Sequence, residues 1–165
     1  MLKDRIEKNF RDFLKEKREN EISILRMLKA DIFNKEKEKR YNKSQEKSDW
    51  DEKELEKQSS LTDDEVLEIV ISRIKKSNES IFEFEKGKRE DLVEKEKKEI
   101  EILKRYLPEQ LLEEEIRKIV KEIIEKIEAK DIRDMGKVMA ELMPRVKGRA
   151  DGALVSKIVK EFLVA

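Results

Sequence analysis

Apolar residues recur along most of this chain at intervals of three and four residues, the spacing of one face of an α-helix. The first two helical segments follow each other across a short charged connection, so they should pair as an antiparallel hairpin. Thr62 and Glu65 have capping-box spacing and open a third segment. The helices are expected near residues 2–14, 20–33, 62–86, 89–107, 112–127, 131–143 and 152–162.

A long charged stretch separates the second and third of these segments. From Lys35 the sequence reads KEKEKRYNKSQEKSDWDEKELEKQSS, which has almost no apolar residues until Trp50 and Leu55. Two interpretations are open: the second helix continues as a solvated charged rod, or a mobile linker occupies residues 41–61, approximately.

Pro108 marks the expected boundary between two subdomains, because proline forces the preceding residue, Leu107, out of helical geometry. We therefore predict an N-terminal helical subdomain over residues 1–107, made of the hairpin, the charged linker and two further helices. Residues 108–165 should form a C-terminal three-helix bundle. The fold class is all-α and multihelical, in two subdomains.

The composition supports this fold class. Charged residues make up 48% of the 165 residues and hydrophobic ones 37%, with four glycines and two prolines. Such a surplus of good helix formers favours helices over a sheet. The N-terminus has no apolar signal region, and no apolar run approaches the length of a membrane span. We expect no membrane association and a cytoplasmic protein.

The segment DIRDMGKVMAELMPRVKGRADG, residues 131–152, holds three of the four glycines and three of the five methionines. Pro144 should end its helix just after Met143. The glycine inside that helix, Gly136, should allow close approach of a neighbour, more readily a helix than a ligand. Asp151 is placed to cap the last helix. The apolar positions of that last helix are Leu154, Val155, Ile158, Val159 and Phe162.

The turn between these two helices is basic, with Arg145, Lys147 and Arg149 just before a helix N-terminus and Gly148 suited to a positive φ. A helix N-terminus flanked by cations is suited to binding phosphate. The alternative is a structural helix connection whose charges remain in water. Residues 130–160 hold eight Lys or Arg against four Asp or Glu, although the whole chain has a formal net charge of zero.

Catalytic motifs are missing from the sequence. The chain has no cysteine and no histidine, which removes thiol chemistry, the usual general base and the commonest metal ligand. It has no phosphate-binding P-loop and no dinucleotide fingerprint. The carboxylates alternate with Lys and Arg at helix-surface spacing, which ion pairing explains. We predict no catalytic residues, no metal and no cofactor.

The same segment carries a family resemblance. Its pattern of DMGKVM, then MP, then VKGRADG resembles the C-terminal signature of the GatB/YqeY family. The stretches SILRMLKADIFNKEKEKR, LTDDEVLEIVISRIKK, EFEKGKREDL and EKKEIEILKRYLPEQL resemble that family in the same order. The chain looks like the stand-alone YqeY form. Its connection near residues 44–59 contains more residues than the family pattern has there.

The resemblance implies a relation to the helical tail of the B subunit of glutamine-dependent tRNA amidotransferases, a tail implicated in holding tRNA. Our first hypothesis is therefore a small accessory protein that binds tRNA or other structured RNA. The second is a protein–protein adaptor that uses the N-terminal hairpin. The third, carbon–nitrogen ligase activity with glutamine as amido donor, follows from family inheritance alone. The candidate RNA-binding residues are Arg145, Lys147, Gly148, Arg149, Gly152, Lys137, Arg133 and Lys157.

Overall fold

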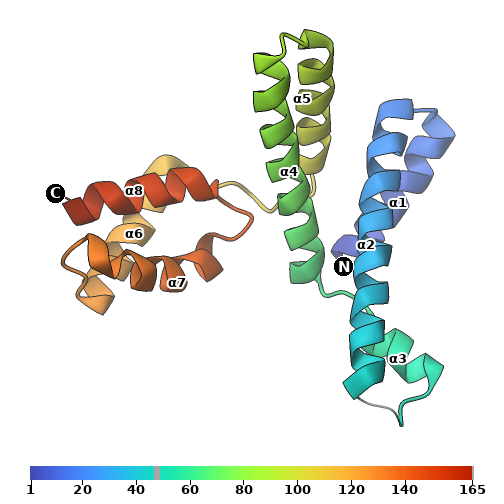
Figure 1. Ribbon diagram of the computed structural model, residues 1–165, viewed down its shortest axis with the longest axis horizontal. Coiled ribbons are helices and arrows are strands. Elements are labelled where there is room, and N and C mark those ends of the chain that lie inside the picture. Colours follow the sequence, from blue (N-terminus) through green and yellow to red (C-terminus); the bar gives the residue numbers. More distant parts are fainter. Residues whose placement is uncertain (47–48, 165) are drawn as a thin grey trace. The chain divides into compact units, whose positions relative to one another are not determined.

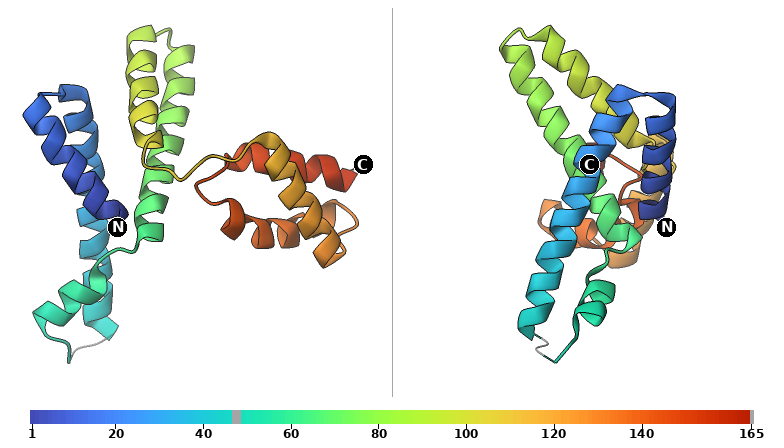
Figure 2. Two further views of the ribbon diagram at one scale, coloured as in Figure 1. Left: turned by 180° about the vertical axis from the view of Figure 1, so that it is seen from behind. Right: turned by 90° about the vertical axis from the view of Figure 1, so that its right-hand side faces the viewer.

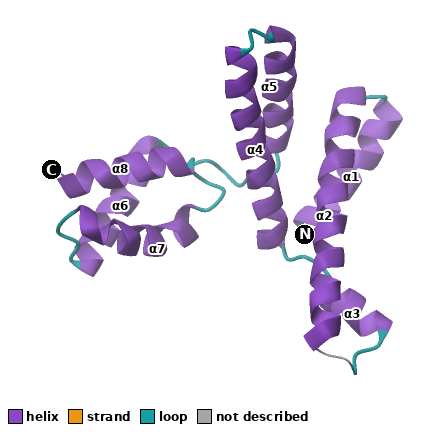
Figure 3. Cartoon of the chain, in the orientation of Figure 1, coloured by secondary structure: helices purple, strands orange, loops and turns teal. Residues whose placement is uncertain are grey.

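The computed structural model describes residues 1–46 and 49–164, and every regular element in these ranges is a helix (Figures 1 and 3). The predicted all-α fold is confirmed. The elements are α1 Leu2–Glu16, α2 Glu19–Glu46, α3 Glu52–Ser59, α4 Asp63–Lys86, α5 Glu90–Lys104, α6 Glu113–Ile127, the 3₁₀ turn η1 Ile132–Asp134, α7 Met135–Val146 and α8 Gly152–Val164.

Contacts between the helices divide the chain into two compact units. The N-terminal unit comprises residues Met1–Tyr106 and contains α1 to α5, and the C-terminal unit begins at Leu107 and contains α6 to α8. None of the helices in the described ranges is both long and apolar enough to cross a membrane.

Two helical hairpins build the N-terminal unit, one from α1 and α2 and the other from α4 and α5 (Figure 2). Each hairpin turns at a lysine in the left-handed region, Lys17 with φ 56° and Lys88 with φ 53°. Both α1 and α2 also contact α4, which joins the hairpins. The buried side chains at these contacts include Ile6, Leu25, Leu28, Val66, Val70 and Leu103.

One arginine links three helices of this unit. The Arg73 guanidinium on α4 donates to Asp31 on α2 at 2.5 Å and to Glu99 on α5 at 3.1 Å. The side chain of Glu99 is only 11% exposed and that of Arg73 only 19%. Because the charges of Arg73 and Glu99 are largely removed from water, each depends on the other, and Asp31 adds a more exposed partner to Arg73.

The charged stretch after Lys35 is more ordered than a linker. Helix α2 continues to Glu46, as the first of the two interpretations predicted, and the short helix α3 follows within the region that the second assigned to a mobile linker. Residues 47 and 48 lie outside the described ranges. Lys and Glu are good helix formers, and Asp51 caps α3 by accepting from the Glu54 N–H at 2.7 Å.

The start of α4 shows the predicted capping box. The Thr62 hydroxyl accepts from the Glu65 N–H at 3.3 Å, and the Glu65 carboxylate accepts from the Thr62 N–H at 2.7 Å. Lys39 of α2 donates to the same carboxylate at 2.7 Å. These hydrogen bonds, chiefly that from Lys39, lower the pKa of Glu65. The capping residue therefore also joins α4 to the charged half of α2.

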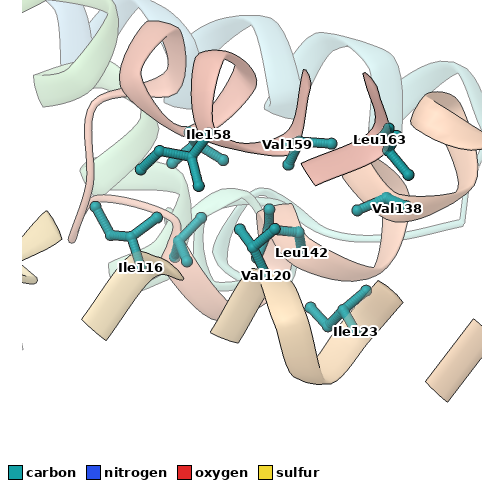
Figure 4. Packing of buried hydrophobic residues seen from close by; sticks show 10 residues of the cluster. Ile116, Val120, Ile123, Val138, Leu142, Ile158, Val159 and Leu163 are labelled. Carbon is teal, nitrogen blue, oxygen red and sulfur yellow. The ribbon is translucent and has the colours of Figure 1, made fainter. Parts of the chain in front are cut away.

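The C-terminal unit has a single apolar core made by its three helices (Figure 4). Met135 and Met139 pack against it, which agrees with their helical spacing, but Met143 is 40% exposed. Phe162, predicted to face inward, is 36% exposed, and the next residue, Leu163, is buried instead. The core residues are Ile116, Val120, Ile123, Val138, Leu142, Val146, Val155, Ile158, Val159 and Leu163.

The prediction that Pro144 ends its helix is wrong, since α7 continues to Val146. A proline lacks one backbone donor, but in the last turn of a helix this affects a single hydrogen bond near an end that frays anyway. Val146 is only 1% exposed, so burial of its side chain favours the extra turn.

Two glycines of the C-terminal unit should respond oppositely to alanine. Gly148 has φ 72°, as predicted, so Gly148→Ala is expected to destabilise the unit by about 1–2 kcal/mol. Gly136 does not approach a neighbour as predicted, because a Cβ there would meet nothing within 4 Å. Gly136→Ala should therefore stabilise the unit by about 0.5–1 kcal/mol through helix propensity. Thermal unfolding of both variants would check this, and equal shifts would contradict it.

Candidate functional site

Backbone hydrogen bonds hold the basic turn between α7 and α8. Val146 C=O accepts from the N–H groups of Arg149 and Ala150, at 2.9 and 3.1 Å, which closes the turn after the helix. Gly148, in the left-handed region, is buried. The predicted glycine geometry is therefore present, but this glycine does not lie on an open surface where a ligand backbone would approach it.

A segment before α6 binds this turn, and we call the contact between residues 109–111 and residues 148–149 the turn clamp. The Leu111 N–H donates to Arg149 C=O at 2.7 Å, and the Gln110 side-chain amide donates to Gly148 C=O at 2.6 Å. The Arg149 guanidinium donates to Glu109 C=O at 3.3 Å. Gly148 and Arg149 thus have structural partners within their own unit.

The N-terminus of α8 is capped by its own chain. The Asp151 carboxylate accepts from the N–H groups of Ala153 and Leu154, at 2.9 and 3.0 Å, which confirms the predicted cap. These are the donors that a phosphate at a helix N-terminus would use, and Asp151 adds a negative charge beside them. Anion binding here must rely on side-chain cations. Gly152 is exposed, and a Cβ added to it would meet nothing within 4 Å.

The candidate cations fall into separate groups. Arg133 and Lys137 lie at the start of α7, and Arg145 and Lys147 lie at or just after its end. Lys137 and Arg145 are eight residues apart, which is about 12 Å along a helix axis. Lys157 lies on α8. A single corner containing all of these side chains is therefore not formed.

Carboxylates of the same unit pair with some of these cations. Lys137 contacts Asp134 at 2.9 Å, and Arg145 approaches Glu122 at 3.9 Å, the long limit of an ion pair. The hydrogen bond from Lys137, followed by that from the Lys130 N–H, lowers the pKa of Asp134. All of these groups are at the surface, where such pairs contribute little and exchange readily with other ions.

The other acids of the segment are also engaged internally. Asp131 accepts from the Arg133 N–H at 2.7 Å, Asp151 caps α8, and Glu141 pairs with Lys126 at 3.1 Å. The side chains of Arg133 and Lys157, in contrast, are exposed and form no ion pair with the described residues. The excess positive charge of the segment is therefore left at these side chains.

Two further cations share this property, and our sequence-based candidates omitted them. Lys130 and Lys160 are exposed and have no carboxylate partner in the described part of the chain. The signal was present in the sequence, because Lys157 and Lys160 are three residues apart and must lie on one face of a helix. The turn η1, which contains Arg133, contacts α8.

The acids near the candidate cations have structural roles. Within the described ranges, no three His, Cys, Asp or Glu side chains gather as a metal site would require. The acids near the candidate cations cap helices or form surface pairs, which are structural roles. The chemistry available at this surface is the binding of an anion by exposed cations.

The fold and this surface define a small all-helical protein of two units, with unpaired cations on the second. The chain belongs to the YqeY-like protein family, whose model matches residues 44–163. It is also similar to Altered inheritance of mitochondria protein 41, mitochondrial, from Pyrenophora tritici-repentis (strain Pt-1C-BFP), with 40% identity over 107 residues. That match covers 63% of this chain and 59% of the relative, so the chain spans less than two thirds of the relative's length.

Proposed function

We propose that the C-terminal unit binds the phosphate backbone of structured RNA, with tRNA as the class that the family resemblance suggests. The observation that carries the proposal is the set of exposed cations without a carboxylate partner. Arg133, Lys157 and Lys160 hold full charges in water, while the nearby acids cap helices or pair with other residues. A polyanion gains by binding such cations because it releases its condensed counterions.

The mode of binding follows from the side chains present. Structured RNA is recognised largely by shape and by phosphate and ribose contacts, so a rigid helical surface with spaced cations is suited to it without stacking aromatics. Arg145 and Lys137 would exchange their surface carboxylates for phosphate oxygens. The exposed and uncrowded Gly152 leaves room for an RNA backbone, whereas Gly148 and Arg149 act through the turn clamp.

Charge reversal at the unpaired lysines of α8 should weaken tRNA binding. We expect Lys157→Glu with Lys160→Glu to lower the slope of log affinity against log salt by about 2, one unit for each phosphate that is no longer bound. The measurement is binding of a total tRNA fraction across a salt series, by fluorescence anisotropy.

The matched control reverses two lysines of α6 in the same unit, Lys118→Glu with Lys121→Glu, which changes the net charge equally. This control should lower the salt slope by less than the α8 variant does. Equal effects of the two pairs would show that only net charge matters. Absence of tRNA binding by the unsubstituted protein would overturn the proposal.

The expected cytoplasmic location stays a prediction. The name of the relative from Pyrenophora tritici-repentis includes the word mitochondrial, which applies to that relative. An RNA-binding role is compatible with either location, because both contain tRNA.

A further inference from the structure

The outer side of α2 exposes large apolar side chains over about four helical turns. Met27, Phe33 and Tyr41 are 38%, 65% and 65% exposed. Ala30 is exposed between them. At 100° per residue, Met27, Ala30, Phe33 and Tyr41 all lie on the side of α2 that faces away from its buried residues. We call this surface, from Ser23 to Tyr41, the outer face of α2.

Acidic side chains are nearly excluded from this face, although Asp and Glu supply 40 of the 165 residues. Among the exposed residues from Ser23 to Tyr41 the one carboxylate is Glu38, and it pairs with Lys35 at 2.9 Å. Arg26 and Lys37 are exposed and form no ion pair with the described residues. The outer face therefore combines apolar side chains with uncompensated positive charge.

The opposite side of α2 is fully used within the unit. Leu25, Leu28 and Ile32 are buried there, and several ion pairs hold the helix to its neighbours, among them Lys3–Glu36 to α1 and Asp31–Arg73 to α4. The outer face is thus a preformed and anchored surface, and a partner that binds it need not pay to order the helix.

We propose that the outer face of α2 docks an acidic amphipathic helix of a partner protein. Met, aromatic residues and Arg are enriched at protein interfaces, and this face exposes Met27, Phe33, Tyr41 and Arg26. Ala30 permits close approach of a second helix between the larger side chains. Arg26 and Lys37 then favour a partner helix whose apolar stripe is bordered by Asp or Glu.

The charge density argues for a protein and against a nucleic acid. From Ser23 to Tyr41 the helix extends about 27 Å and offers two uncompensated cations, at Arg26 and Lys37. Duplex DNA carries one negative charge per ~1.7 Å of its axis, so two cations would neutralise little of a duplex backbone over this length.

Site-specific photocrosslinking tests the proposal. Ala30 is replaced by p-benzoylphenylalanine in the full chain, a cell extract is irradiated, and the crosslinked peptides are identified by mass spectrometry. The expected peptide has apolar residues at helical spacing bordered by Asp or Glu. A synthetic copy of it should bind the unsubstituted protein, with affinity reduced at least about tenfold by Arg26→Glu with Lys37→Glu and by Phe33→Ser with Tyr41→Ser.

Matched controls use other exposed residues of the same unit. Phe82 on α4 is 59% exposed, so Phe82→Ser should leave the affinity unchanged, and the same should hold for Lys95→Glu with Lys98→Glu on α5. Circular dichroism confirms that each variant is folded. Crosslinks to RNA, to a second copy of this chain or to a peptide without acidic borders would overturn the proposal. So would a yield no higher than with the crosslinker at Lys98.

Discussion

Arg73→Met is expected to lower the free energy of unfolding of the N-terminal unit by about 3–5 kcal/mol, because it leaves the largely buried Glu99 without its partner. The same change frees Asp31 and removes the link between three helices. Trp50 is the one tryptophan of the chain and lies in this unit, so its fluorescence in a urea titration reports the unfolding.

Two controls distinguish the loss of the ion pair from the loss of a charge. Lys76→Met changes an exposed residue of the same helix and should shift the free energy by less than about 0.5 kcal/mol. Arg73→Met with Glu99→Met removes both buried charges and should recover much of the lost stability. If Arg73→Met lowered the free energy of unfolding no more than Lys76→Met does, the ion pairs of Arg73 would not stabilise the unit.

Leu142→Ala is expected to unfold a large fraction of the C-terminal unit. The side chain is fully buried between the three helices, and such truncations cost about 2–5 kcal/mol. A unit this small has a low free energy of unfolding, so a loss of this size removes a large part of it. Hydrogen exchange followed by mass spectrometry should show faster exchange across α6, α7 and α8, and unchanged exchange across α1 to α5.

The neighbouring residue provides the control. Met143 is 40% exposed, so Met143→Ala should cost less than about 1 kcal/mol and leave the exchange pattern intact. Equal exchange in the Leu142→Ala and Met143→Ala variants would mean that Leu142 is not a core residue. Faster exchange in both units would mean that they unfold together.

Local patterns in the sequence were sufficient to predict most of the helices. Ile116, Val120 and Ile123 follow one another at intervals of four and three residues, which puts them on one face of α6, and the structure buries all three. The capping residues Thr62 and Asp151 act as predicted. Each of these features depends on residues within a turn or two of one another, which is the range that sequence spacing describes.

The misses arose where tertiary contacts outweigh local preference. Pro144 indicates a helix end when taken alone, but burial of Val146 extends α7 past it. The charged residues that form α3 have no apolar periodicity, and its contacts with α2 join residues beyond the reach of helical spacing, as Arg40 with Glu56. Phe162 and Leu163 are neighbours near the end of a helix, where apolar spacing does not settle which one is buried.

The candidate site was predicted by residue type but not by arrangement. The excess of basic residues was visible in the sequence, and so was the left-handed glycine. The partners of Gly148 and Arg149 could not be found, because Gln110 and Glu109 precede them by 38 and 40 residues. The availability of Lys157 and Lys160 depends on which carboxylates their neighbours use, and this requires coordinates.

The turn clamp has a practical consequence for dividing this protein. A fragment that begins at Glu113, the first residue of α6, would keep all three helices of the C-terminal unit. It would lose residues 109–111, which form the turn clamp with the turn between α7 and α8. It would leave the carbonyls of Gly148 and Arg149 without their donors. A fragment that starts at Leu107, the first residue of the unit, retains these donors.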